Sequence, residues 1–399
     1  MNDFEQIKHR DKQFVMNTYS PYDIAFIHGE GSTLTDSTGK KYTDFLGAIA
    51  VNSLGYNSSI FTDALIEQTH KVVSISNIFY NPYRGLLAEK LIEGTSLDKV
   101  FFGNSGAEAN ECALKLARKY FHLRGENKYK FVSAIDSFHG RTIATVALTG
   151  QSKYNAPYIQ LTNGFGNYVP FNDIDALDKA LSDANVCALV IEPILGESGV
   201  IPATKEYILA CREITRKNGQ LLILDEVQTG AGRTGKFWAH QHFNIEADIV
   251  TTAKGIGGGV PIGACLASSD VSSAFSPGDH GTTFGSSPLV CATSYAVVSK
   301  IKELGFMSNV SEVGRYLVNS LESIKSSAFK EIRGLGLMVG VELDASITAK
   351  NVVKSMLTKG YILNACGNNA LRFLPPLIIS KAEIDSMTCA LKSVMSSLA

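Results

Sequence analysis

Leu221-Leu222-Ile223-Leu224 runs directly into Asp225-Glu226-Val227-Gln228-Thr229-Gly230 in this chain of 399 residues. Four consecutive apolar residues predict a strand buried on both faces, as in a parallel sheet between layers of helices. Similar short apolar runs alternate with helical periodicity between residues 99 and 270. The predicted strands are Lys99–Phe102, Tyr129–Ser133, Ala188–Ile191, Leu221–Leu224 and Ile249–Thr252. The sequence therefore predicts an α/β fold with a mostly parallel central sheet covered by helices.

The segments on either side of this region follow other patterns. Gly31–Phe45 alternates and turns at Ser37-Thr38-Gly39, which predicts a hairpin, and a helix is expected from Ile60 to about Val72. After residue 290, helical stretches flank the strand-like runs Leu337–Leu343 and Leu371–Leu374. We therefore expect three parts: an N-terminal segment (1–55) that packs with the small domain, a large domain (56–290) and a small α+β domain (291–399).

Composition excludes several classes of protein. Hydrophobic residues make up 45% of the chain and charged residues 19%, which excludes a disordered or fibrous protein. With 37 basic and 38 acidic side chains the formal charge is −1, and no run of Lys and Arg offers a phosphate-tracking patch. Nucleic acid is therefore not an expected partner.

The cysteines and the N-terminus indicate the compartment. The seven cysteines are widely spaced, form no C-x-x-C pair and mostly lie in apolar surroundings, which is typical of reduced core thiols. Met1–Arg10 mixes charges and lacks the apolar stretch of a signal peptide, and no apolar run approaches the roughly 20 residues that span a bilayer. We expect a cytoplasmic protein with no membrane partner and no metal.

Polar residues follow the predicted strands, where ligands bind in open α/β sheets. After Phe101-Phe102 comes Gly103-Asn104-Ser105-Gly106-Ala107-Glu108, followed by helical periodicity. A glycine-containing turn that opens a helix presents free N–H groups and the positive end of the helix dipole, and so predicts an anion site. Ser105 and Glu108 also have the spacing of a capping box, which any helix may use. Both interpretations stay open on these residues alone.

Asp225 and Lys254 are the two charged residues that stand out. A carboxylate at the end of a buried strand is costly unless a cation meets it, which indicates a functional partner for Asp225. Lys254 lies between the apolar run Ile249–Ala253 and Gly255-Ile256-Gly257-Gly258-Gly259. A lone lysine is usually a solvated surface charge. Lys254 is followed by glycines, so few side chains crowd its amine. This suits an amine that forms and breaks a bond with a bulky aldehyde.

Two nucleotide-binding patterns overlap this region. Gly230-Ala231-Gly232-Arg233-Thr234-Gly235 matches the dinucleotide fingerprint and, with Lys236, nearly matches a P-loop. The P-loop needs Ser or Thr where Phe237 stands, and the fingerprint needs a helix directly after the glycines, where no apolar stripe is found. Both nucleotide interpretations therefore fail on their context.

Several motifs, in order along nearly the whole chain, resemble those of class III pyridoxal-phosphate aminotransferases, and within them the members that act on acetylornithine. The matching residues are Asp44-Phe45 with Ile49–Asn52, Asn104–Glu111, Phe138–Arg141, Glu192–Ile194 with Gly196-Glu197, Asp225–Gly235, Ala253–Gly255 with Gly257–Ile262, His280–Gly285 and Arg333–Met338. The resemblance implies the type I fold of pyridoxal-phosphate-dependent transferases, pyridoxal 5′-phosphate as cofactor, and a homodimer with shared active sites.

The resemblance also implies roles for single residues. Lys254 would hold the cofactor covalently and then shuttle the proton, while Asp225 would pair with the protonated pyridine nitrogen. Gly106 and Ala107 would bind the phosphate, Phe138 and Val227 would cover the two ring faces, and Gln228 would approach the ring hydroxyl. Thr283 would reach the phosphate of the neighbouring subunit. The implied cofactor-binding set is Ser105, Gly106, Ala107, Phe138, Asp225, Glu226, Val227, Gln228, Lys254 and Thr283.

Substrate choice is expected to depend on two arginines, because arginine forks match carboxylates. Any single arginine is more safely read as a structural ion pair, so these roles come from the resemblance. It implies that Arg141, with Thr282 nearby, holds the carboxylate of acetylornithine. Arg372 would hold that of glutamate or 2-oxoglutarate, and Glu197 would cover Arg372 in the other half reaction. Tyr19 is a further substrate candidate near the entrance.

The expected reaction moves the terminal amino group of acetylornithine to 2-oxoglutarate, giving N-acetylglutamate 5-semialdehyde and glutamate in arginine biosynthesis. Ornithine, succinylornithine, succinyldiaminopimelate and 4-aminobutyrate are alternative donors, and a mutase acting on glutamate semialdehyde would use the same lysine. An inactive cofactor or nucleotide binder is the alternative from another class. The chain departs from the family pattern at Tyr56, where histidine is common, and at Ser286-Ser287, where Gly-Asn is usual.

Overall fold

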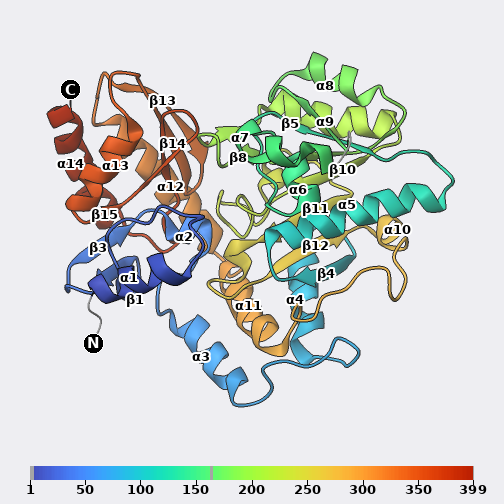
Figure 1. The fold of residues 1–399 in the computed structure, drawn as a ribbon, viewed down its shortest axis with the longest axis horizontal. Coiled ribbons are helices and arrows are strands. Elements are labelled where there is room, and N and C mark those ends of the chain that lie inside the picture. The colour runs from blue at the N-terminus through green and yellow to red at the C-terminus, as the bar shows by residue number, and fades with distance from the viewer. Residues whose placement is uncertain (1–3, 162–164, 399) are drawn as a thin grey trace.

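The larger half of the molecule is built on a seven-stranded sheet (Figure 1). The computed structural model describes residues 4–161 and 165–398. Residues 1–3, which open the stretch examined for a signal peptide, therefore lie outside the described residues. The strand order is β4-β12-β11-β10-β7-β5-β6, and every pairing is parallel except the two made by β12. The bounds are β4 (Lys99–Gly103), β5 (Lys130–Ala134), β6 (Gly166–Val169), β7 (Val186–Ile191), β10 (Leu221–Asp225), β11 (Ile249–Ala253) and β12 (Gly263–Ala267).

The two faces of this sheet are covered by different helices. Successive residues of β10 alternate between two apolar clusters, since Leu222 and Leu224 belong to one and Ile223 to the other. The first cluster includes side chains of α4, α8, α9 and α11, and the second those of α5 and α10. The bounds are α4 (Pro82–Ile92), α5 (Gly106–Leu123), α8 (Ile174–Leu181), α9 (Lys205–Lys217), α10 (Ser269–Ser272) and α11 (Pro288–Ile301). The predicted helical cover on both faces is confirmed.

The smaller half combines the C-terminal elements with the N-terminal segment (Figure 1). The short strand β15 (Tyr361–Ile362) pairs in parallel with β3 (Lys41–Asp44), and Phe45 belongs to the same apolar cluster as the C-terminal helices. The remaining strands of the two small sheets are β1 (Phe26–Glu30), β2 (Thr33–Asp36), β13 (Phe329–Leu335), β14 (Met338–Leu343), β16 (Asn364–Cys366) and β17 (Ala370–Phe373). Helices α12 (Phe306–Glu322) and α13 (Ala349–Thr358) pack on strands of these sheets, and α14 (Lys381–Leu398) packs on both helices.

The other elements lie before the first strand or between the strands and helices given above. They are α1 (Phe4–Phe14), α2 (Gly47–Ala50), α3 (Ser59–Thr69), α6 (Ile143–Leu148), α7 (Ser152–Asn155), β8 (Ile194–Leu195), β9 (Ile201–Pro202), and the 3₁₀ turns η1 (Ala156–Leu161), η2 (Ala239–His242) and η3 (Lys254–Ile256). The hairpin at Ser37–Gly39 is confirmed, and the helix predicted to reach Val72 ends at Thr69. In the part of the chain that is described, no helix is long and apolar enough to cross a membrane.

Two strands of the central sheet were not predicted from the sequence. β6 and β12 each contain glycine, and β12 (Gly-Ala-Cys-Leu-Ala) is made mostly of small residues rather than β-branched ones. Such residues have low strand propensity, but they allow close approach. A Cβ added to Gly263 would overlap the carbonyl oxygen of Ser105. Close packing against the start of α5 therefore explains why small residues stand here.

Candidate active site

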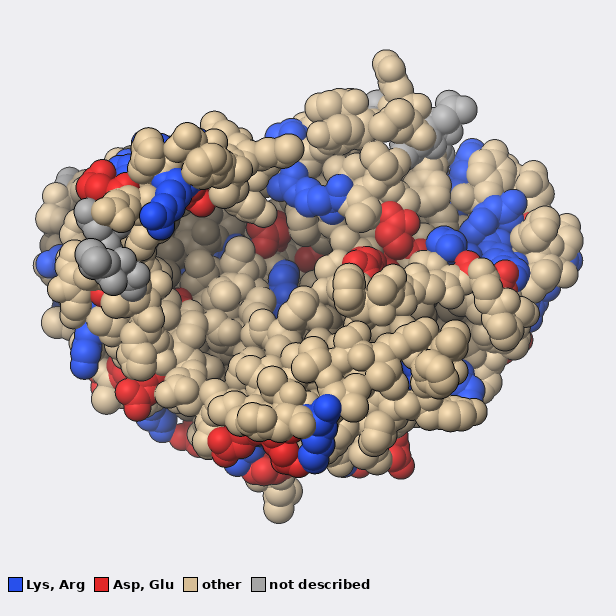
Figure 2. Space-filling view, turned by 60° about the horizontal axis from the view of Figure 1, so that its bottom comes forward, with Lys and Arg blue, Asp and Glu red and all other residues tan. Residues whose placement is uncertain are grey.

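The carboxyl ends of four strands converge on a cavity of about 240 Å³. Strand β4 leads through Gly103 to α5, β7 ends just before Glu192, β10 ends at Asp225, and β11 ends just before Lys254. The cavity is lined by Gly106, Ala107, Asn110, Phe138, His139, Gly140, Arg141, Glu192, Asp225, Val227, Gln228 and Lys254. Residues that are up to 148 positions apart in the sequence thus form one site at the edge where open α/β sheets bind ligands. The space-filling view shows a hollowed face with basic and acidic side chains mixed around it (Figure 2).

Lys254 presents an amine without a partner to this cavity. None of the described residues hydrogen-bonds to its Nζ, and its backbone has a φ of 47°, which non-glycine residues seldom adopt. Burial lowers the pKa of Lys254; the charge of Glu197 opposes this shift and that of Arg372 adds to it. A larger fraction of this amine is therefore neutral at a given pH than for a surface lysine, as a nucleophilic lysine requires.

Asp225 lies at the end of β10 in a set of charged and polar partners. Its Oδ2 accepts from Asn110 Nδ2 at 2.8 Å and meets His139 Nδ1 at 2.8 Å, while Oδ1 accepts from the backbone N–H of Val227 at 3.0 Å. Burial lowers the pKa of His139, yet the hydrogen bond to Asp225 and the charges of Asp225 and Glu192 raise it above its ordinary value. These contacts hold Asp225 in place and leave room for Oδ1 to accept a further N–H.

Three residues of this network had no predicted role. Asn110 and His139 fix Asp225. Glu192 accepts from the N–H groups of Phe138 at 2.9 Å and Gly196 at 3.2 Å, and burial raises its pKa. All three lie inside motifs that the sequence analysis quoted. Asn110 lies in α5, His139 in the loop after β5 and Glu192 directly after β7, so sequence spacing gave no signal for their individual functions.

The first turn of α5 offers an anion site. Gly106 and Ala107 line the cavity, and a Cβ at Gly106 would lie 2.8 Å from Val227 Cγ1, so only glycine leaves this space open. The Ser105 hydroxyl accepts from the N–H of Glu108 at 3.2 Å. The Glu108 carboxylate turns to Asn104 N–H at 2.9 Å, so the reciprocal half of the predicted capping box is not formed. Ser105 thus caps the helix and does not itself line the cavity.

Arg372 is buried and held by an acid. Its NH1 lies 2.6 Å from Glu197 Oε1 and also donates to the carbonyl oxygen of Gly196 and to Gln228 Oε1, while NH2 donates to Asn364 Oδ1. Burial alone would raise the pKa of Glu197, but the charge and hydrogen bonds of Arg372 lower it. Glu197 and Arg372 therefore form a buried ion pair, and the role of this pair in the half reactions stays a prediction.

Arg141 differs from Arg372 in having no acid beside it. It lines the cavity, and its guanidinium lies 3.8 Å from the ring centre of Tyr154 and 5.4 Å from that of Phe138. Within the described ranges no residue forms an ion pair with it. Aromatic rings hold the guanidinium in place without neutralising it, which leaves it available to a carboxylate.

Besides Ser105, six of the predicted residues do not line this cavity: Glu197 and Arg372, whose ion pair is described above, and Glu226, Thr282, Thr283 and Tyr19. Both oxygens of the Glu226 carboxylate turn away, accepting from the Thr229 hydroxyl and from the N–H groups of Ala239 and His240, so the structure does not support Glu226 as a cofactor contact. The Thr282 hydroxyl accepts from Asn104 Nδ2 at 3.0 Å in a neighbouring hollow. Thr283 is exposed, and Tyr19 is 83% exposed. Nothing in one chain places these last three residues against Lys254.

Comparisons with known proteins agree with this geometry. The family model described as aminotransferase class-III matches residues 15–395. This chain is a class-III aminotransferase. A curated acetylornithine aminotransferase from Caldanaerobacter subterraneus subsp. tengcongensis is 46% identical over 391 residues, covering 97% of this chain and 98% of the relative.

Solved structures of aminotransferases share the whole fold with this class-III aminotransferase. The ornithine aminotransferase of Toxoplasma gondii, reported with partial occupancy of pyridoxal phosphate at its active site, superposes with a TM-score of 0.93 at 30% identity, covering 100% of this chain and 96% of that one. The acetylornithine aminotransferase of Elizabethkingia anophelis superposes with a TM-score of 0.89 at 30% identity, covering 100% of both chains. The central sheet, its helices and the smaller half are thus those of a pyridoxal-phosphate transferase.

Pyridoxal 5′-phosphate is the cofactor of this aminotransferase, and the residues at the cavity fit it. An amine without a partner, a buried carboxylate with a free acceptor position and a helix N-terminus open beside a glycine match its aldehyde, ring nitrogen and phosphate. His139 Nε2 is also buried without a partner among the described residues. No described group of His, Cys, Asp or Glu is arranged to hold a metal ion.

Proposed function

We propose that this aminotransferase transfers the terminal amino group of N2-acetylornithine to 2-oxoglutarate, giving N-acetylglutamate 5-semialdehyde and glutamate in arginine biosynthesis. The observation that supports it is the contrast between the two arginines. Arg372 forms an ion pair with Glu197, whereas Arg141 lines the cavity and forms no ion pair with any residue that the structure describes. A donor whose carboxylate lies far from its reacting amine would bind Arg141. The carboxylate of 2-oxoglutarate or glutamate would instead displace Glu197 from Arg372.

We propose that Lys254 binds the cofactor and then moves the proton. Its amine would be the nucleophile of the cavity, and its lowered pKa leaves a larger neutral fraction to accept a proton than a surface lysine has. When bound, pyridoxal phosphate supplies an electron-withdrawing ring that stabilises negative charge at the substrate carbon. The charges of Glu197 and Arg372 both act on the pKa of Lys254, which supports a place for the lysine beside the proposed substrate-binding pair.

The other cavity residues would orient the cofactor. Asp225 would hold the proton on the ring nitrogen, because Asn110 and His139 fix its carboxylate in one position. The N–H groups of Gly106 and Ala107 would bind the phosphate. Phe138 and Val227 would cover the ring and exclude water, and Gln228, which also joins Glu197 and Arg372, would approach the ring hydroxyl.

Rates with a panel of amino donors test this proposal. We expect kcat/KM with acetylornithine to exceed that with ornithine, succinylornithine, succinyldiaminopimelate and 4-aminobutyrate. Ornithine is the second candidate, because structures of ornithine aminotransferases superpose with TM-scores up to 0.94. A higher kcat/KM with ornithine than with acetylornithine would replace the first proposal by the second.

We further propose a homodimer with shared active sites. Ile78, Phe79 and Tyr80 are 82%, 62% and 97% exposed in one chain, and Phe284, beside Thr283, is 67% exposed. Asn77 joins the two segments by donating to the carbonyl oxygens of Thr282 and Gly285, each at 3.0 Å. Such an apolar surface is large for an isolated chain, and a second copy would cover it and bring Thr283 to the partner's cofactor.

We also propose a cytoplasmic location. All seven cysteines are free thiols, five of them buried, as expected where thiols stay reduced. Fractionation of cells that express the native chain tests this.

A further inference from the structure

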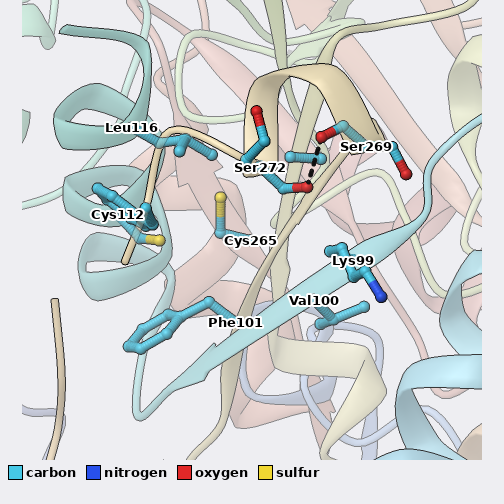
Figure 3. Close-up of a pocket in the computed structure, with 11 residues that line it drawn as sticks. Lys99, Val100, Phe101, Cys112, Leu116, Cys265, Ser269 and Ser272 are labelled. Atoms are coloured by element: carbon cyan, nitrogen blue, oxygen red, sulfur yellow. Dashed lines mark hydrogen bonds between the residues drawn. The ribbon is translucent and has the colours of Figure 1, made fainter. Parts of the chain in front are cut away.

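Two cysteines outside the active site line a cavity of about 360 Å³ (Figure 3). Cys112 comes from α5 and Cys265 from β12, and both side chains are almost fully buried in the protein. Exposed residues also line the cavity, among them Lys99, Ser269 and Ser273, so it reaches the surface. The cavity is therefore a place where a small molecule can meet two thiols that the aminotransferase reaction does not use.

Lys115 and His280 form a polar relay beside this cavity, against two residues that line it. Lys115 Nζ lies 2.9 Å from His280 Nδ1 and also donates to the carbonyl oxygen of Asp279. Because a lysine ammonium can only donate, Nδ1 accepts and the imidazole proton stands on Nε2. The rings of Phe101 and Phe275 hold His280 with centre distances of 4.6 and 5.8 Å. The imidazole is thus fixed as a donor.

The Cys112 and Cys265 side chains reach the same cavity from α5 and from β12 (Figure 3). The hydrogen bond from the Cys265 thiol lowers the pKa of Cys112, burial opposes this shift, and the hydrogen bond from His280 with the charges of His280 and Lys115 lowers it further. The same contact raises the pKa of Cys265. The Cys112 thiol therefore loses its proton more readily than the Cys265 thiol, as an attacking and a resolving cysteine require.

We propose that Cys112 and Cys265 form a dithiol site that reduces small hydroperoxides and closes into a disulfide. The Cys112 sulfur attacks the terminal peroxide oxygen, the O–O bond breaks, and water or an alcohol leaves with the released proton. This gives a sulfenic acid on Cys112. The Cys265 sulfur then attacks that sulfur, the S–O bond breaks, and a water leaves with the Cys265 proton. The two thiols lose two electrons, which the peroxide takes up.

The proposed dithiol reaction does not depend on which amino donor the aminotransferase uses. Cys187 is a matched reference, because it lies in the same apolar cluster as Cys112 and burial raises its pKa. Cys389 is a second reference because it is exposed to solvent. Reactivity governed by exposure alone would oxidise Cys389 first, whereas the proposed site oxidises Cys112 first.

The experiment treats the native holoenzyme at pH 7 with hydrogen peroxide, raised until Cys389 reacts, then alkylates and maps the peptides without reduction. We expect a peptide pair linked through Cys112 and Cys265, formed about tenfold faster than Cys389 is oxidised. Cys265→Ser should stop at a sulfenic acid on Cys112 that a 1,3-diketone traps, and Cys187→Ser should keep the link. Oxidation of Cys389 before Cys112, or oxidised Cys112 without a link to Cys265 in the native protein, would overturn the proposal.

Discussion

At the scale of single residues, the reactivity of Lys254 depends on two opposite charges. Glu197 and Arg372 form an ion pair at 2.6 Å, and both act on the lysine amine. The negative charge of Glu197 raises the pKa of Lys254, and the positive charge of Arg372 lowers it. Removing Glu197 should therefore lower the pKa of Lys254, and removing Arg372 should raise it.

The first prediction concerns this pKa. In the cofactor-free protein, acylation of Lys254 should reach half its maximal rate at a pH below the ordinary lysine value of about 10.4, because only the neutral amine reacts. Glu197→Gln should move that midpoint further down, and Arg372→Gln should move it up. Mass spectrometry of the Lys254 peptide across pH measures it, with the exposed Lys205 as reference. Shifts of the same sign in both variants would contradict the electrostatic account.

The second prediction separates the two arginines. Arg141→Ala should mainly slow the half reaction with acetylornithine and Arg372→Ala the one with glutamate, each by about 2 to 5 kcal/mol, since a bidentate charged contact is lost. Glu197→Ala should leave the reaction with glutamate no slower while selectivity for acetylornithine falls. Single-turnover cofactor spectra with each donor measure both halves. Equal losses in both halves for both arginine variants would show that the division of roles is wrong.

At the scale of elements, Glu226 ties the strand β10 to the turn η2. Its carboxylate is fully buried and accepts from Thr229, Ala239 and His240. Neighbouring residues of one motif therefore have separate tasks: Asp225 faces the cavity, and Glu226 faces the protein interior. The alternation of side chains at the end of a strand explains this.

The third prediction follows from these bonds. Glu226→Gln should lower the free energy of unfolding by about 2 kcal/mol. One carboxylate oxygen, which accepts hydrogen bonds, becomes an NH₂ group, and this donor would face N–H groups that also donate. Cofactor content per folded molecule should not change. Denaturant unfolding measures the first quantity and absorbance the second, with the exposed Glu246→Gln as control. Loss of cofactor at unchanged stability would restore Glu226 as a cofactor contact.

At the scale of the whole molecule, one chain does not bring Thr283 to its own cavity. The loop that carries it is tied to Asn77 and is flanked by exposed apolar side chains, which favours a role in a second copy. Active sites that combine two chains can be tested by mixing two defective variants.

The fourth prediction uses this property. Lys254→Ala and Thr283→Ala should each be impaired as homodimers. After unfolding and refolding together, the mixed dimer contains one site with both defects and one with neither. Activity should therefore rise in the mixture to about a quarter of the native value per chain, since half of random dimers are mixed and each has one intact site. Light scattering gives the assembly state. No gain over the separate variants would show that the sites are not shared.

The sequence by itself determined the family, five of the seven strands of the central sheet, and the positions of Asp225 and Lys254 at the ends of buried strands. Periodic apolar runs predict strands and helices because burial follows local spacing, and Asp225 and Lys254 stand where buried strands end. The domain boundaries at 55/56 and 290/291 stay predictions. The pairing of β15 with β3 agrees with a unit that contains both the N-terminal segment and the C-terminal elements.

Only the tertiary structure decided which side chains meet. It placed Asn110 and His139 on Asp225, turned Glu226 into the interior, left Arg141 open while Glu197 covers Arg372, and brought Cys112 beside Cys265. These contacts join residues on separate strands and helices, and their energies depend on distance, direction and burial. Sequence spacing carries none of these three quantities, so a motif can name the chemistry without showing which of its residues perform it.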